Sequence, residues 1–198
     1  MFQMPLFRRD FPSLEGKEVH LRMPLSKDHA EWATLRAESR AFLEPWEPRW
    51  ASDELSRHAY RLRLKRYYSE YDQGSGAAFF IFERAGGRLA GGISISNIRR
   101  GVAQSAHIGY WMGERFAGQG LMREALHLVI HFSFGELALH RLEAACIPNN
   151  ERSMRLLEKA GFQREGLLRS YLRINGSWQD HCLYSLIAGE YQRQEKRD

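Results

Sequence analysis

The chain has 198 residues, of which 43% are hydrophobic. This length and composition suit a single α/β domain spanning residues 1–198, with residues 192–198 as a frayed polar tail. Its 29 Lys and Arg against 24 Asp and Glu give a net charge of +5, which fits an acidic ligand, nucleic acid or simple solubility. No basic run is long enough to decide among these, and most charges are expected to cover a solvated surface.

Two cysteines, Cys146 and Cys182, fall in predicted strands and lack Cys-x-x-Cys spacing. The pattern supports neither a disulfide framework nor a zinc ribbon, and it favours buried thiols in a reducing compartment. Charged residues at positions 8–10 interrupt the apolar core that a signal peptide needs, and no stretch reaches the roughly 20 apolar residues of a membrane span. We therefore expect a cytoplasmic protein without metal or membrane contact.

The first part of the chain predicts a strand, two helices and a loop. Residues 18–23 alternate as a strand does, and Ser26 is placed to cap the helix that follows. Residues 42–50 combine two prolines with three bulky aromatic side chains, a composition typical of functional loops. Ser52 is expected to cap a long helix that ends at the glycine-rich residues 74–76.

The middle of the chain predicts a hairpin, then a strand, a turn and a helix. Residues 77–84 and 88–98 have the pattern of two strands joined by a glycine turn, and residues 105–112 have the composition of a third strand. A Gly-x-Gly turn at residues 118–120 opens a helix whose apolar residues recur up to Gly135, expected as a left-handed C-cap. Backbone N–H groups at such a helix start lack internal partners, so a turn that admits an anion there predicts phosphate binding.

The last part continues the alternation of strand and helix. Residues 141–147 predict a strand that lies parallel to the strand before the glycine turn, across a right-handed crossover. Asn150 is placed to cap a helix that ends at Gly161. Residues 167–174 and 177–187 then predict a hairpin about an Asn-Gly turn. No internal repeat or second domain is indicated.

Several separated segments resemble one family. Residues 117–122, residues 150–153 and the Lys-Ala-Gly-Phe end at residues 159–162 resemble the acetyl-CoA site of the GNAT superfamily of N-acetyltransferases. Residues 37–48, which contain Phe-Leu-Glu-Pro-Trp-Glu-Pro, are similar to the RimJ/RimL-type ribosomal-protein alanine N-acetyltransferases. Residues 161–166 and 171–181 are similar to the same family, closest to its RimJ branch. The resemblance implies an α/β fold of the α+β type. Its mixed, mostly antiparallel twisted sheet has helices on both faces and one central parallel β-α-β crossover.

The resemblance also implies where acetyl-CoA, the cosubstrate, binds. Backbone N–H groups from Ala117 to Met122 would meet its pyrophosphate, and the backbone at Met112 and Gly113 would hold its pantetheine arm. Asn150 would hydrogen-bond that arm, although Asn before a helix is also an ordinary N-cap. The expected binding residues are Met112, Gly113, Ala117, Gly118, Gln119, Gly120, Leu121, Met122, Asn150 and Ser153.

Acetyl transfer from a thioester to an amine needs a route for the amine proton and a donor to the departing thiolate. Many relatives donate from a Tyr whose place is taken here by Leu157. The resemblance to the RimL-like enzymes implies Ser153 as the proton donor, with a surface or back-bonding helix serine as the alternative. His107 is a candidate base because histidine titrates near neutrality. Glu44 and Glu47 in the aromatic loop are two further candidates, and each of the three has a purely structural alternative.

Two more groups are weaker candidates. Asp180 and His181 would supply the base or only brace the last hairpin. His127 and His131 lie one helical turn apart, as metal ligands often do, but no third ligand accompanies them. Core or surface histidines are the better interpretation.

The leading hypothesis is direct, acetyl-CoA-dependent transfer to the N-terminal α-amine of a protein beginning with Ala or Ser, a ribosomal protein by the resemblance. One alternative is a small-molecule acceptor, such as an amino acid, polyamine or antibiotic. The other is a ribosome-assembly factor that contacts ribosomal RNA with little catalysis. A monomer and a homodimer are both compatible with the sequence.

Overall fold

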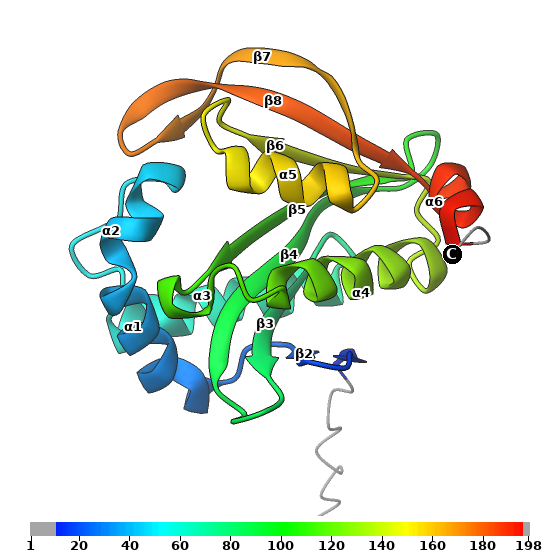
Figure 1. Ribbon diagram of the computed structural model, residues 1–198. Coiled ribbons are helices and arrows are strands. Elements are labelled where there is room, and N and C mark those ends of the chain that lie inside the picture. The colour runs from blue at the N-terminus through cyan, green and yellow to red at the C-terminus, as the bar shows by residue number, and fades with distance from the viewer. Residues whose placement is uncertain (1–10, 196–198) are drawn as a thin grey trace, which may run out of the picture.

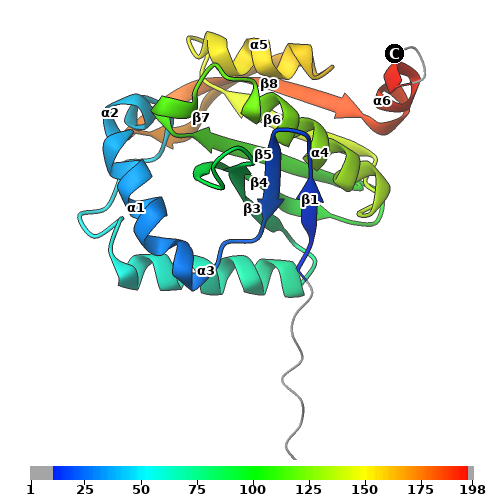
Figure 2. The same ribbon diagram turned by 60° about the horizontal axis from the view of Figure 1, so that its bottom comes forward.

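The computed structural model describes residues 11–195. One sheet of eight strands, in the order β1-β2-β3-β4-β5-β6-β8-β7, runs through the molecule. Helices α1 to α3 lie on one face of the sheet, and α4 and α5 lie on the other (Figures 1 and 2). The strands are β1 (Ser13–Glu15), β2 (Val19–Arg22), β3 (Ala77–Glu83), β4 (Leu89–Arg99), β5 (Ser105–Met112), β6 (Arg141–Cys146), β7 (Gln163–Ile174) and β8 (Ser177–Ile187).

The helical segments connect these strands. The α-helices are α1 (His29–Glu38), α2 (Arg40–Leu43), α3 (Arg57–Asp72), α4 (Leu121–Gly135), α5 (Glu151–Lys159) and α6 (Ala188–Glu195). Three short 3-10 turns are η1 (Ser26–Asp28), η2 (Glu44–Trp46) and η3 (Glu114–Phe116). The mixed, mostly antiparallel sheet with helices on both faces confirms the predicted fold class.

Strand β3 shows why the core has two layers. All seven of its residues are buried, because the strand is covered on both faces, and the first six form a continuous apolar run. Phe79 meets Phe132 of α4 edge to face, with ring centroids 5.7 Å apart, whereas the next residue, Phe80, lies 6.5 Å from Tyr60 of α3. Since successive strand side chains point to opposite faces, each core layer is filled from alternate positions.

Strands β5 and β6 form the parallel pair, and they are paired over only part of their length. Ser105–His107 align with Arg141–Glu143, while β5 continues to Met112 and β6 to Cys146. Figure 1 shows the two strands diverging beyond this short pairing. We call the space between them the β5–β6 gap.

Strand β5 remains bonded to β4 on its other edge. Its register with β4 extends to Met112, and the Gly113 N–H continues this edge by donating to the Ala90 carbonyl at 2.8 Å. Because backbone groups alternate along a strand, the N–H and C=O of Tyr110 and Met112 point toward the β5–β6 gap.

Two helix starts differ from the sequence prediction. Ser26 opens the turn η1 instead of capping a helix, and the Asp28 carboxylate accepts the Leu25 N–H at 2.8 Å. Helix α3 begins after Ser56, whose hydroxyl accepts the Ala59 N–H at 3.1 Å, so Ser52 is not its cap. In both places two polar residues of similar capping propensity stand close together, and tertiary packing chooses between them.

The C-terminal ends of two helices also differ from the sequence prediction. Gly135 is the last residue of α4 and has no positive φ; the left-handed conformation falls on Ala138, with φ of +49°. Helix α6 includes positions 192–195, which were expected to fray, and its Tyr191 packs on Phe134 with ring centroids 5.6 Å apart. Positions 196–198 and the charged positions 8–10 lie outside the described residues. Within residues 11–195, every helix is too short or too polar to cross a membrane.

Candidate active site

The glycine turn before α4 has the conformation that an anion site needs. Gly118 and Gly120 have φ of +79° and +84°, and Gly120 is the N-cap residue of α4. A Cβ atom added to either glycine would meet nothing within 4 Å, so backbone conformation rather than crowding requires glycine here. The space before the turn is open, and the positive end of a 15-residue helix faces it.

Hydrogen bonds and an ion pair hold the residues just before this turn in place. The Gln119 side chain donates to the Arg115 carbonyl at 2.8 Å, and Arg115 pairs with Glu38 at 3.1 Å. The Ala117 N–H bonds to the Glu114 carbonyl at 3.0 Å. The Ala117 N–H is thus already bonded within the chain, and the donors from Gly118 onward stay the candidates for phosphate binding.

Gly113 likewise has a structural reason to be glycine. Its N–H and C=O bond to Ala90 and Phe116, and an added Cβ would lie 2.4 Å from a methyl group of Leu35. Of the two residues expected to hold the pantetheine arm, Met112 is the one whose backbone groups face the β5–β6 gap.

Asn150 is the N-cap of α5, and its Oδ1 accepts the Ser153 N–H at 3.2 Å. This confirms the capping role and fixes the first turn of α5 beside the β5–β6 gap. The Ser153 hydroxyl then lies 2.7 Å from the Tyr110 hydroxyl on β5. Sequence reasoning missed Tyr110. The alternation along β5 could have indicated it, because positions 106, 108 and 110 share the face that α4 and α5 cover.

Burial keeps both neighbours of Ser153 protonated. Burial raises the pKa of Tyr110 well above its usual value, and the hydrogen bond with Ser153 offsets part of that rise. Burial also raises the pKa of Cys146, at the end of β6, to about 11, with the adjacent Ser153 again offsetting part of the shift. Cys146 is therefore a neutral thiol rather than a nucleophile. Tyr110, Ser153 and Cys146 therefore form a cluster of neutral polar groups on the α5 side of the β5–β6 gap.

The opposite face of the sheet carries a small cavity of about 180 Å³. Three strands form its floor, where register places Phe80, Gly92 and Trp111 side by side. A Cβ on Gly92 would lie 2.5 Å from the Trp111 indole nitrogen, so glycine is needed to seat that ring. The full lining is Pro24, Glu47, Tyr67, Ala78, Phe79, Phe80, Gly92, Ile93, Ser94, Gly109, Tyr110 and Trp111.

Glu47 holds the wall of this small cavity. Its carboxylate accepts two hydrogen bonds from the buried Arg36 guanidinium, at 3.0 and 2.5 Å, and one from the Trp50 indole at 2.8 Å. Its backbone carbonyl accepts the Asn175 N–H at 2.9 Å, which ties residues 44–50 to the tip of the β7–β8 hairpin. Glu44 instead pairs with the exposed Arg40 at 2.7 Å and does not line the cavity.

His107 lies on the same sheet face as Gly109 and Trp111, two residues from the small cavity. Its Nε2 is 2.9 Å from the Glu143 carboxylate, which Arg141 also contacts at 2.7 Å. The imidazole is partly exposed, at 29% of its side-chain surface. The contact is one of distance alone, because the buried Nε2 atom has no hydrogen-bond partner among the described residues.

The other candidates have structural roles. The Asp180 carboxylate accepts the Ser170 N–H at 2.8 Å, and the buried His181 contacts the Gln179 carbonyl at 3.0 Å, so both brace the β7–β8 hairpin. Within the part of the chain that the structure describes, no three His, Cys, Asp or Glu side chains gather closely enough to hold a metal ion.

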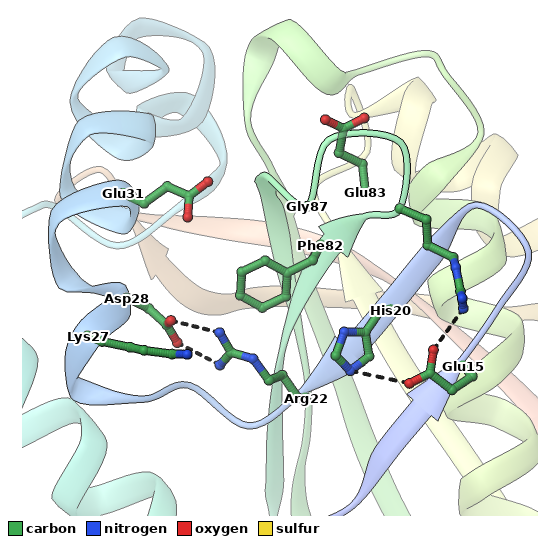
Figure 3. Close-up of a pocket in the computed structure, with 10 residues that line it drawn as sticks. Glu15, His20, Arg22, Lys27, Asp28, Glu31, Phe82, Glu83 and Gly87 are labelled. Atoms are coloured by element: carbon green, nitrogen blue, oxygen red, sulfur yellow. Dashed lines mark hydrogen bonds and ion pairs between the residues drawn. The ribbon is translucent and has the colours of Figure 1, made fainter.

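A larger cavity of about 540 Å³ lies elsewhere, between β1, β2, the start of α1 and the β3–β4 turn (Figure 3). It shares no lining residue with the small cavity. Arg22 pairs with Asp28 at 2.7 Å, and Glu15 pairs with both His20 and Arg84. Because these charges neutralise one another, size does not mark this cavity as the reactive centre.

The comparisons with known proteins agree with this geometry. Residues 18–163 match a family model described as an acetyltransferase (GNAT) domain. The "Probable N-acetyltransferase YjcK" of Bacillus subtilis (strain 168) is 38% identical over 88% of this chain and 96% of the relative. The [ribosomal protein uS5]-alanine N-acetyltransferase of Escherichia coli (strain K12) is 33% identical over 93% of this chain and 96% of that protein.

A solved structure, Mycobacterium smegmatis RimJ in complex with CoA-disulfide, has a TM-score of 0.85 and 30% identity, covering 94% of this chain and 93% of the other. The chain belongs to the GNAT family of N-acetyltransferases, of the RimJ/RimL type. It is thus an enzyme that takes an acetyl group from acetyl-CoA. The open turn at Gly118 and Gly120 fits the phosphates of that cosubstrate.

The glycine turn generates the first prediction. Replacing Gly120 by Val places a branched side chain where phosphate approaches, so acetyl-CoA affinity should fall on the order of 10- to 100-fold, the loss expected for charge-assisted hydrogen bonds. Calorimetric titration measures it. The matched control is Gly74→Val, at a residue with φ of +64° and equally open surroundings, which carries the same backbone strain far from the turn. Equal affinity of both variants would contradict the phosphate assignment.

The second prediction concerns the Arg36–Glu47 ion pair. Because Arg36 is only 6% exposed, Glu47→Gln leaves a buried cation without its counter-charge and should lower the free energy of unfolding by about 3 kcal/mol. Glu44→Gln, which breaks an exposed pair in the same segment, should lower it by less than about 1 kcal/mol. Urea denaturation of the wild-type protein and both variants measures these changes in the free energy of unfolding. Similar losses would show that Glu47 does not anchor residues 44–50.

Proposed function

We propose that this enzyme transfers acetyl directly from acetyl-CoA to the N-terminal α-amine of a protein whose first residue is Ala or Ser. The observation that carries this proposal is the two-sided β5–β6 gap. Donors and the anion turn lie on the α4–α5 side, and a small cavity lies on the other side. An acceptor entering the small cavity would meet the thioester through the gap without covalent attachment to the enzyme.

The size of the small cavity supports a small first residue. At about 180 Å³ it is smaller than the roughly 300 to 1,000 Å³ of sites for drug-sized ligands, and aromatic rings wall it. An amino terminus with an Ala or Ser side chain suits this volume better than an extended polyamine or an antibiotic. The relative named for the alanine of ribosomal protein uS5 supports a ribosomal protein as the acceptor.

The contacts of the three candidate bases support His107 over the two glutamates. Both oxygens of Glu47 already accept hydrogen bonds from Arg36 or Trp50, so this carboxylate positions the cavity wall rather than taking a proton. Glu44 is occupied by Arg40. His107, which lies beside Glu143 on the acceptor side of the sheet, is then the base of this proposal and collects the amine proton through an intervening water.

Ser153 acts on the other side of the gap. Its hydroxyl is placed by the Asn150 cap at the first turn of α5, where it would donate a hydrogen bond to the departing sulfur. A weak base is sufficient for the acceptor, because an α-amine with a pKa near 8 is about one-tenth neutral at pH 7.

Acceptor choice is tested by kcat/KM for peptides beginning with Ala, Ser or Leu and for an N-terminally blocked peptide containing lysine. Ala and Ser peptides should be preferred over Leu. The blocked peptide should be slower by two orders of magnitude or more, since at pH 7 the neutral fraction of a lysine amine is roughly two hundredfold smaller.

Two results would contradict this acceptor. A free amino acid, polyamine or antibiotic that outcompetes every peptide would assign the enzyme to small amines. Absence of acetylation on all amines, together with RNA binding that falls steeply with salt, would favour the assembly-factor alternative.

The base is tested with His107→Gln. At pH 7 this variant should lose on the order of tenfold or more in kcat/KM, and the loss should shrink above about pH 8, where the α-amine is already neutral. His20→Gln is the matched control, because His20 also pairs with a glutamate, Glu15 at 3.4 Å, but lies in the large cavity. A loss that does not change with pH would remove His107 from proton transfer.

A further inference from the structure

We propose that Tyr110 is a positioning residue for acetyl transfer, whose phenol directs the Ser153 hydroxyl hydrogen into the β5–β6 gap. The inference rests on the proposed role of Ser153 as donor to the departing sulfur and deepens it. No sequence motif indicates this role for Tyr110. It follows from the packing of the first turn of α5 on β5, which brings the Ser153 hydroxyl to the phenol.

The hydrogen-bond geometry sets the direction. A single hydrogen lies between the two oxygens, which are 2.7 Å apart, so one hydroxyl donates and the other accepts. The phenol is the stronger acid of the two and hence the better donor, and it stays protonated in its buried setting. Ser153 therefore accepts from Tyr110, and its own hydrogen must point elsewhere.

The surroundings of Ser153 leave the gap as the productive direction. Its backbone N–H is fixed by the Asn150 cap, so the hydroxyl starts from a defined place on α5. One competing acceptor is near, the Cys146 sulfur. With the phenol on one side, the hydroxyl is restricted in rotation. Without it, the hydroxyl is free to turn toward that sulfur.

In the acetyl-transfer step, neither the Tyr110 hydroxyl nor the Ser153 hydroxyl gains or loses a proton overall. The C–N bond forms as the C–S bond breaks, and the amine proton leaves through His107 and water. Ser153 stabilises the negative charge on sulfur by hydrogen bonding. Because a thiol has a pKa near 8.5, the thiolate is a competent leaving group and takes up its proton from solvent after release. Tyr110 thus affects turnover only through Ser153.

A double-mutant cycle tests this dependence. Tyr110→Phe, which keeps the ring and its packing, should lower kcat on the order of tenfold while the Kd for acetyl-CoA stays nearly unchanged. Ser153→Ala should lower kcat at least as much. The double variant should be no slower than Ser153→Ala alone, because removing the hydroxyl removes what Tyr110 positions.

Tyr184→Phe is the matched control. It removes another buried tyrosine hydroxyl, which donates to Glu158 at 2.9 Å on the same side of the sheet, and it should leave kcat unchanged. Thermal melts verify that all four variants are folded.

Three outcomes would overturn the inference. Losses that multiply in the double variant would show that Tyr110 acts independently of Ser153. Normal turnover of Tyr110→Phe would show that the phenol only fills space, and normal turnover of Ser153→Ala would remove the donor. The cycle is run by CoA release with the best amine found in the acceptor panel. Failure of the proposed acceptor is therefore distinguishable from failure of the Tyr110–Ser153 pair.

Discussion

The fold depends on one constraint: strands β5 and β6 are hydrogen-bonded at Ser105–His107 and then separate. A continuous sheet would place the α4–α5 layer and the α1–α3 layer on opposite sides of an unbroken wall. Separation leaves backbone donors and acceptors along β5 unpaired, which is costly unless a ligand or water satisfies them. It also opens a path between the two faces. The anion turn and the small cavity can then act on one reaction from opposite sides.

Each side of the gap is held by a different kind of interaction. On the α5 side, neutral hydroxyl groups and a thiol meet in a buried setting, where hydrogen-bond direction rather than charge determines the chemistry. On the cavity side, charged groups predominate: Arg36 pairs with Glu47 in the wall, and the Glu143 carboxylate lies beside His107. The separation is physically sensible, because a carboxylate beside the departing thiolate would disfavour that anion by like-charge repulsion.

Much of this arrangement was predictable from local patterns. The strand of residues 105–112, the glycine turn and the Asn150 cap each follow from short-range propensities, and the structure has them at those positions. The misplaced caps at Ser26 and Ser52 arose where neighbouring polar residues compete and packing decides. Tyr110 was missed for another reason. Its partner Ser153 is 43 residues away, and only the three-dimensional crossing of α5 over the end of β5 brings them together. Arg36 and Glu47 are 11 residues apart, and they too are brought together only by the fold of the chain between them.

A crystal structure with a bisubstrate, in which CoA is joined through an acetyl bridge to the α-amine of an Ala-initiated peptide, would show directly whether the two substrates meet through the β5–β6 gap. The pyrophosphate should lie on the backbone of Gly118 and Gly120, the sulfur within hydrogen-bonding distance of the Ser153 hydroxyl, and the Ala side chain in the small cavity beside Trp111. A peptide that enters from the α5 side, or a sulfur remote from Ser153, would contradict the two-sided gap.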